Sequence, residues 1–261
     1  MATNDKRSNH QTAIRFAHQV AQRLVDLAQL KPGDTVLDVA TGVGVAALYA
    51  AGQVTPLGRV MGVDQPSPWL DYARRRLAAV GASHVVFVEG ELAQLDFADS
   101  TFDCVLCSSA IFLLPDMAAG LREWRRVLKP GGTVAFSGYG KRSFQPLVTL
   151  LETCLRRYDV NIPPQPFAWQ QLTDLEAFSE LLRSAAFSGI DVRSEQLGNY
   201  LMSTDEWWDL LWLREFCKPL RQLSPDALRC FKAEHLAEVA QLATANGIWL
   251  NVTAVFAVGK S

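Results

Sequence analysis

Residues 35–44 read TVLDVATGVG, and this stretch decides the fold expected for the chain. An apolar run that ends close to one acid, Asp38, is typical of a buried parallel strand. Gly42 and Gly44 have no Cβ, so the chain can turn sharply there and a ligand can approach the main chain closely. The small residues at 45–51 (VAALYAA) favour a helix lying tight on the sheet with its amide-rich N-terminus at the turn. Together these features predict a ledge for a nucleoside-bearing cofactor.

The glycine turn by itself fits two classes of cofactor. Residues 42–47 (GVGVAA) match the dinucleotide fingerprint G-x-G-x-x-G/A, and Asp64 follows Gly44 by about 20 residues. Asp64 ends the expected second strand, 58–64, where a carboxylate can accept hydrogen bonds from ribose hydroxyls. Because both cofactor classes carry a ribose, the turn leaves an NAD(P)-dependent oxidoreductase open as an alternative.

Later segments distinguish the two classes. The expected third strand, 84–89, leads into EGEL at 89–92, and a polar turn precedes the expected fourth strand, 102–108. The sequence LKPGG at 128–132 ends a helix and reverses into a fifth strand, 133–138. Strands that alternate with helices in this way predict a parallel sheet with right-handed crossovers.

The motifs VLDVATGVG, GVD, EGEL, FDCVLCSS and LKPGG, in this order, resemble the class I S-adenosylmethionine-dependent methyltransferases. They look most like the small-molecule branch that includes the ubiquinone/menaquinone-biosynthesis methyltransferases. The resemblance covers residues 36–139 strongly and the region from 189 onward weakly. It implies S-adenosyl-L-methionine as cofactor and an α/β, Rossmann-like, doubly wound fold. The expected sheet is seven-stranded and mostly parallel, with an antiparallel last strand and helical cap insertions.

The resemblance also implies a set of cofactor-binding residues. Asp38 would lie near the methionine amino group, Asp64 would hold the ribose hydroxyls, and Glu91 with the Leu92 amide would read the adenine edge. Ala40, Thr41, Gly42 and Gly44 would lie under the methionine and ribose, Gln65 beside the adenine, and Ser108 beside the methionine. Two positions depart from the family pattern, since Ala40 replaces a frequent glycine and Glu91 a common aspartate. On the residues alone, Asp38 could instead cap the following helix and Glu91 could be a solvated carboxylate.

We expect a single methyltransferase domain over residues 1–261. Its expected parts are an N-terminal helical extension (1–33), a cofactor-binding core (34–140), acceptor-cap insertions (141–173 and 199–248) and closing strands (189–198 and 249–259). Helices are expected at 11–30, 147–158, about 204–218 and 225–247, with Pro219 ending the third, and the final strand is expected at 249–258. The first of these helices would place Arg15, Phe16 or His18 near the cofactor if it closes over the site; packing on the sheet edge is the alternative.

Aromatic residues are concentrated in the two insertions. They include Trp169, Trp207, Trp208, Trp212, Phe216 and Trp249. Because loops after the carboxyl ends of the strands lie beside the ligand in this topology, the insertions suggest a cap over an apolar or aromatic acceptor. Trp208, Trp212 and Phe216 also have helical spacing, so they could simply pin the cap in place.

Composition limits the class of partner. The net charge is −2 and the pI about 6.1, so no basic field favours nucleic acid, and a small-molecule acceptor is expected. The polar N-terminus lacks a signal-peptide pattern and no stretch resembles a membrane span, while the odd number of cysteines, 5, suggests a reducing compartment. These features predict a cytoplasmic protein. Cys104 and Cys107 are three apart on a strand and point to opposite faces, so no metal site is expected.

The expected reaction is in-line SN2 methyl transfer to an O or C nucleophile, less readily N, of a small metabolite. The fourth strand ends in CSSA and lacks the Asn/Asp-Pro-Pro-aromatic signature of nucleobase and glutamine N-methyltransferases. No catalytic residue is assigned; Tyr139, Lys141, Glu152 and His18 are candidates for a general base by location only. Against the oxidoreductase alternative, no tyrosine is followed four residues later by lysine. A catalytically silent cofactor-binding protein is the remaining alternative.

Overall fold

The computed structural model describes residues 11–163, 167–212 and 216–261, which form two compact units. The sheet unit comprises residues 17–140, 172–195 and 254–261. The helical unit comprises the described residues of the ranges 1–16, 141–171 and 196–253. In the described part of the chain, no helix is both long and apolar enough to cross a membrane.

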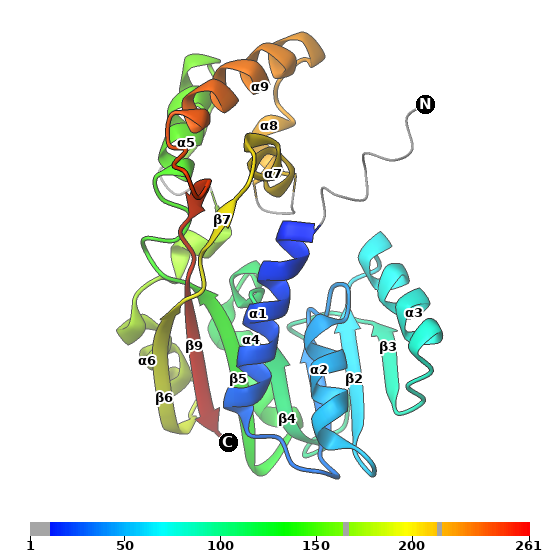
Figure 1. The fold of residues 1–261 in the computed structure, drawn as a ribbon. Coiled ribbons are helices and arrows are strands. Elements are labelled where there is room, and N and C mark those ends of the chain that lie inside the picture. The colour runs from blue at the N-terminus through cyan, green and yellow to red at the C-terminus, as the bar shows by residue number, and fades with distance from the viewer. Residues whose placement is uncertain (1–10, 164–166, 213–215) are drawn as a thin grey trace. The chain divides into compact units, whose positions relative to one another are not determined.

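The sheet unit is built on a seven-stranded sheet with the order β3-β2-β1-β4-β5-β9-β6 (Figure 1). The strands are β1 (Thr35–Val39), β2 (Arg59–Asp64), β3 (Val85–Glu89), β4 (Phe102–Cys107), β5 (Leu128–Tyr139), β6 (Ser188–Gln196) and β9 (Thr253–Lys260). Strands β1 to β5 are parallel to one another, and β9 is antiparallel to β5. The predicted mostly parallel sheet with an antiparallel last strand is thus confirmed. Its order reverses between β1 and β4, which is where ligands bind in open α/β sheets.

Helices flank this sheet. They are α1 (Gln11–Ala28), α2 (Val45–Val54), α3 (Pro68–Val80), α4 (Met117–Val127) and α6 (Leu175–Ser184), with a short 3-10 helix, η1 (Ile111–Leu113). Local signals set both ends of α3, since the Ser67 side chain accepts a hydrogen bond from the Leu70 amide and Gly81 ends the helix at φ +70°. On α4, Leu121 and Trp124 are fully buried, because they lie on one helical face.

The LKPGG reversal takes a form that the sequence did not indicate. The fifth strand begins at Leu128 rather than at Thr133, and its pairing with β4 shifts register between Phe102 and Cys104. Phe102 pairs with Leu128, whereas Cys104 pairs with Thr133. The reversal is therefore a bulge within one strand, in which Gly131 takes up a left-handed φ of +77°.

The helical unit contains a helix pair and a small sheet. Its elements are α5 (Leu147–Arg157), η2 (Ala168–Gln171), β7 (Asn199–Leu201), α7 (Thr204–Leu210), α8 (Cys217–Leu220), α9 (Pro225–Ala240) and β8 (Ile248–Leu250). Helix α5 packs against α9, and β7 pairs with β8 antiparallel. The predicted helix at 147–158 is confirmed.

Three predicted boundaries in this region are wrong. The helix expected at 204–218 ends at Leu210, and Pro219 lies in the first turn of α8, where a missing N–H costs no helical hydrogen bond. Helix α9 ends at Ala240; Gly247, at φ +105°, instead closes a turn with Thr244. The strand expected at 249–258 is divided into β8 and β9, because Asn251 between them bonds the loop at 142–144 instead of a strand.

Candidate cofactor site

The glycine turn between β1 and α2 uses left-handed backbone at alternate residues. Ala40, Gly42 and Gly44 have φ values of +57°, +55° and +78°. An alanine in this region costs about 1–2 kcal/mol, so the turn holds one strained residue among its glycines. A Cβ added at Gly42 would meet no atom within 4 Å, whereas one at Gly44 would lie 2.5 Å from Cζ of Phe87. The main chain is therefore open at Gly42 and tightly packed at Gly44.

Asp38 fastens this turn from inside. Its Oδ2 accepts hydrogen bonds from the Thr41 hydroxyl at 2.6 Å and the Ala47 amide at 3.0 Å, and the residue is only 1% exposed. Burial raises the pKa of Asp38 to about 7, although the bonds from Thr41 and Ala47 favour ionisation and oppose this shift. Its Oδ1 is buried without a hydrogen-bond partner. Asp38 thus bonds an amide of the following helix, as one of the two sequence interpretations expected, and retains an unpaired oxygen.

Asp64 fastens the turn from the neighbouring strand. Its Oδ2 accepts a hydrogen bond from the Gly42 amide at 2.7 Å and its Oδ1 one from the Gln65 amide at 2.8 Å. The Thr41 amide also donates to the Val63 carbonyl at 3.1 Å. The turn and the carboxyl end of β2 therefore form one hydrogen-bonded structure. Each Asp64 oxygen has a second lone pair that could accept a further hydrogen bond.

The residues expected near adenine lie at the carboxyl ends of β2 and β3. Gln65 Nε2 donates to Glu91 Oε2 at 3.2 Å, which brings these two exposed side chains together. Leu92 is buried, and its carbonyl accepts a hydrogen bond from the Trp124 indole at 3.0 Å. Through this bond α4 fixes the segment that follows β3.

Ser108 follows the end of β4 and is half-buried. Among the described residues no hydrogen bond joins Ser108 to the glycine turn, so its predicted place beside the methionine stays a prediction. Its neighbour Ser109 has a φ of +54°, and the Ser109 amide donates to the hydroxyl of Ser137 on β5 at 2.9 Å. Sequence reasoning missed Ser137, as it missed Phe87, because neither belongs to a motif.

The contacts of the candidate general bases do not identify any of them as a catalytic residue. His18 Nδ1 lies 3.1 Å from the Tyr49 hydroxyl, and burial, followed by the charge of Arg76, lowers the pKa of His18. Glu152 lies on α5, where its Oε2 is 3.9 Å from Nη2 of Arg156. Arg15 and Phe16 fall outside the described side chains. No catalytic residue is therefore assigned.

Most of the tryptophans expected to form a cap are core residues of the helical unit. Trp169 and Trp207 are fully buried or nearly so, and Trp208 and Phe216 are also buried. Trp212 and Trp249 are exposed. The buried rings stabilise the unit itself, so they do not by themselves indicate an aromatic acceptor.

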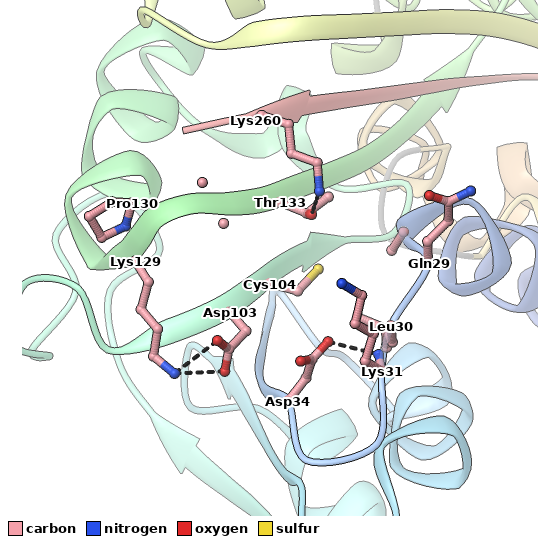
Figure 2. A pocket seen from close by; sticks show the side chains of 13 residues that line it. Gln29, Leu30, Lys31, Asp34, Asp103, Cys104, Lys129, Pro130, Thr133 and Lys260 are labelled. Atoms are coloured by element: carbon pink, nitrogen blue, oxygen red, sulfur yellow. Dashed lines mark hydrogen bonds and ion pairs between the residues drawn. The ribbon is translucent and has the colours of Figure 1, made fainter.

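A pocket of about 210 Å³ lies at the amino-terminal edge of the sheet, and none of the predicted cofactor residues line it (Figure 2). Lys129 Nζ lies 2.9 and 2.8 Å from the two oxygens of Asp103, which also accepts a bond from the Thr35 amide at 2.8 Å. Burial alone would raise the pKa of Asp103, but the bonds from Lys129 and Thr35 outweigh it and lower that pKa. These contacts join the amino-terminal ends of β1 and β4, whereas the glycine turn follows the carboxyl end of β1.

The residues that build this site match a known protein family. Residues 37–136 match the methyltransferase domain family. The ubiquinone/menaquinone biosynthesis C-methyltransferase UbiE of Klebsiella pneumoniae subsp. pneumoniae is 34% identical over 132 residues, covering 50% of this chain and 53% of that protein. Nocamycin O-methyltransferase of Saccharothrix syringae is 34% identical over 127 residues, covering 49% and 45%. The chain thus spans about half the length of these two relatives.

A solved structure agrees over almost the whole chain. The YcgJ protein of Bacillus subtilis superposes with a TM-score of 0.62 at 18% identity, covering 94% of this chain and 98% of that one. At this identity the likeness concerns the fold alone. The domain match shows that residues 37–136 form a methyltransferase domain, and the strand order agrees with the class I S-adenosylmethionine-dependent fold expected from the motifs.

Proposed function

We propose that this protein transfers a methyl group to an O or C atom, less readily N, of a small apolar or aromatic metabolite. The observation that carries the proposal is the glycine turn held between two strand-end carboxylates, within the residues that match the methyltransferase domain. The expectations of no nucleic-acid substrate and of a cytoplasmic location remain predictions.

The residues of the turn fit the cofactor in chemistry. Gly42 leaves open space beside the main chain, as close approach of a nucleoside requires. The unpaired Oδ1 of Asp38 could accept a bond from an ammonium group or a bridging water, and the second lone pairs of Asp64 could accept ribose hydroxyls. Gln65 and Glu91 would contact the adenine. This assignment, with Ala40, Thr41, Gly44, Leu92 and Ser108 completing the set, is part of the proposal.

When bound, S-adenosylmethionine supplies a methyl group already activated by a sulfonium. The protein therefore has to hold the acceptor in line with the methyl–sulfur bond and to exclude water. A general base is required only for an acceptor that is protonated at working pH, such as a phenol, and not for a carboxylate. We propose that the predicted insertions, 141–173 and 199–248, select the acceptor.

Two measurements test this function. Calorimetric titration should give binding of S-adenosylmethionine and of its demethylated product, and no binding of NAD(H). With cofactor carrying a deuterated methyl group, mass spectrometry should then detect the label in at least one member of a panel of phenols, quinols, carboxylic acids and amines. Binding of NAD(H) alone would overturn the cofactor assignment. Cofactor binding without transfer to any acceptor would favour the silent protein.

The substitution Asp64→Ala should weaken S-adenosylmethionine binding by about 1–3 kcal/mol, because it removes the proposed ribose acceptors and the anchor of the Gly42 amide. Calorimetry on the folded variant measures this loss. Asp103→Ala is the matched control, since Asp103 also accepts a main-chain amide at 2.8 Å but lies at the opposite edge of the sheet. Equal affinity in the wild type and Asp64→Ala would show that the strand-end assignment is wrong.

A further inference from the structure

Three side chains of metal-ligating types converge inside the helical unit, and none of them is assigned to the cofactor. Cys154 comes from α5, and His235 and Glu238 come from α9, where a spacing of three places them on one helical face. Their ligand atoms all lie within 4.8 Å of one another. Cys154 and His235 are both 0% exposed. The cluster therefore joins the two packed helices from within.

Two buried atoms of this cluster have no partner. His235 Nδ1 and Glu238 Oε2 are both buried without a hydrogen bond. The Trp207 indole donates to His235 Nε2 at 2.9 Å, so the neutral ring carries its proton on Nδ1. Leaving a donor and an acceptor unpaired in the interior is costly, which points to a ligand between them.

We propose that Cys154 Sγ, His235 Nδ1 and Glu238 Oε2 bind a divalent transition-metal ion of the zinc type. Sulfur, imidazole nitrogen and carboxylate oxygen are the donors that Zn²⁺ takes in proteins, and three of them leave a fourth position for water. Arg157 Nη2 donates to the other Glu238 oxygen, Oε1, at 2.5 Å and so leaves Oε2 for the ion. The charge of Arg157 is shared with Glu234, whose Oε1 accepts from Arg157 Nε at 2.8 Å. A thiolate and a carboxylate would balance the charge of the ion.

Metal binding requires a defined movement of protons. Because a cysteine binds metal as the thiolate, the Cys154 thiol loses one proton to solvent as the sulfur–metal bond forms. His235 gives up its proton on Nδ1 and takes up another on Nε2, so the number of protons on the ring does not change. Nε2 can then no longer accept from Trp207, whose indole must find another partner. Tetrahedral coordination also brings the ligand atoms to about 3.6 Å from one another, so the helices close slightly.

The test uses the full chain, freed of metal with a chelator and titrated with Zn²⁺ or Co²⁺. We expect one tightly bound ion per chain, release of about one proton as measured by calorimetry in buffers of different ionisation enthalpy, a thiolate-to-cobalt absorption band and a change in tryptophan emission. Cys154→Ser should abolish the band and weaken binding by about 100-fold, and Glu238→Gln should weaken binding while keeping the band.

Two neighbours on α9 give matched controls. Cys230 is exposed and lies outside the cluster, and Glu234 pairs with Arg157 and Tyr158. Cys230→Ser and Glu234→Gln should keep the band and the stoichiometry. A band that survives in Cys154→Ser, or that is lost in Cys230→Ser, would overturn the proposal, as would the absence of any band in the wild type. Circular dichroism of each variant confirms that it is folded.

Discussion

Asp38→Asn should remove a pH dependence of stability amounting to about 4 kcal/mol between pH 4 and pH 8. Asp38 has a pKa of about 7 in the folded chain against an ordinary value of 3.8, a difference of about three units at 1.36 kcal/mol each. Because the unfolded chain loses this proton first, wild-type stability falls as pH rises from about 4 to about 7 and is then level. The asparagine side chain cannot ionise, so the stability of the wild type relative to the variant should decline over this range. Urea unfolding at several pH values measures it.

Asp103→Asn gives a control of opposite sign. The pKa of Asp103 is lowered in the folded chain, so its contribution is present above the ordinary pKa of aspartate and is lost as pH falls through the folded value. The stability of the wild type relative to Asp103→Asn should therefore increase with pH in the acidic range. A wild-type advantage over Asp38→Asn that stays constant from pH 4 to pH 8 would contradict the assignment of a raised pKa to Asp38.

Gly44→Ala should destabilise the protein by about 2–5 kcal/mol and weaken cofactor binding. About 1–2 kcal/mol comes from alanine at a φ of +78°, and a further 1–3 kcal/mol from overpacking against Phe87. The ring cannot move aside easily, because a Cβ at Gly62 would lie 2.6 Å from its Cδ1, which shows that Phe87 already packs closely on both glycines. Denaturant unfolding and calorimetric titration measure the two effects.

The Gly131→Ala variant measures the cost of backbone strain without a steric clash. Gly131 has a φ of +77°, nearly that of Gly44, but a Cβ there would meet no atom within 4 Å. Its replacement should cost only about 1–2 kcal/mol. In a Phe87→Leu background, which removes the atom nearest to the new Cβ, Gly44→Ala should cost about as much as Gly131→Ala. Equal losses for both glycine variants in the wild-type background would refute the packing argument.

Much of the sheet unit could be predicted because its signals are local. The glycine turn and the alternation of strands and helices each depend on residues close together in the chain, and the structure confirms them. The region after 196 was harder to predict, because the effect of a proline or a glycine depends on its position within a helix or turn. Pro219 reads as a helix end in the sequence but lies in the first turn of α8.

The sequence by itself determined the class of the domain at 37–136, since the motif order from VLDVATGVG to LKPGG is a linear property of the chain. Only the tertiary structure decided what the acids do. It buries both carboxylates to 1% exposure, where Asp38 accepts from the Thr41 hydroxyl and the Ala47 amide. It also makes Asp64 the acceptor for the Gly42 amide and places Phe87 against Gly44. It also unites Cys154 with His235 and Glu238. Burial and contact between distant segments depend on how the helices and strands pack. The spacing of residues along the chain does not predict that packing.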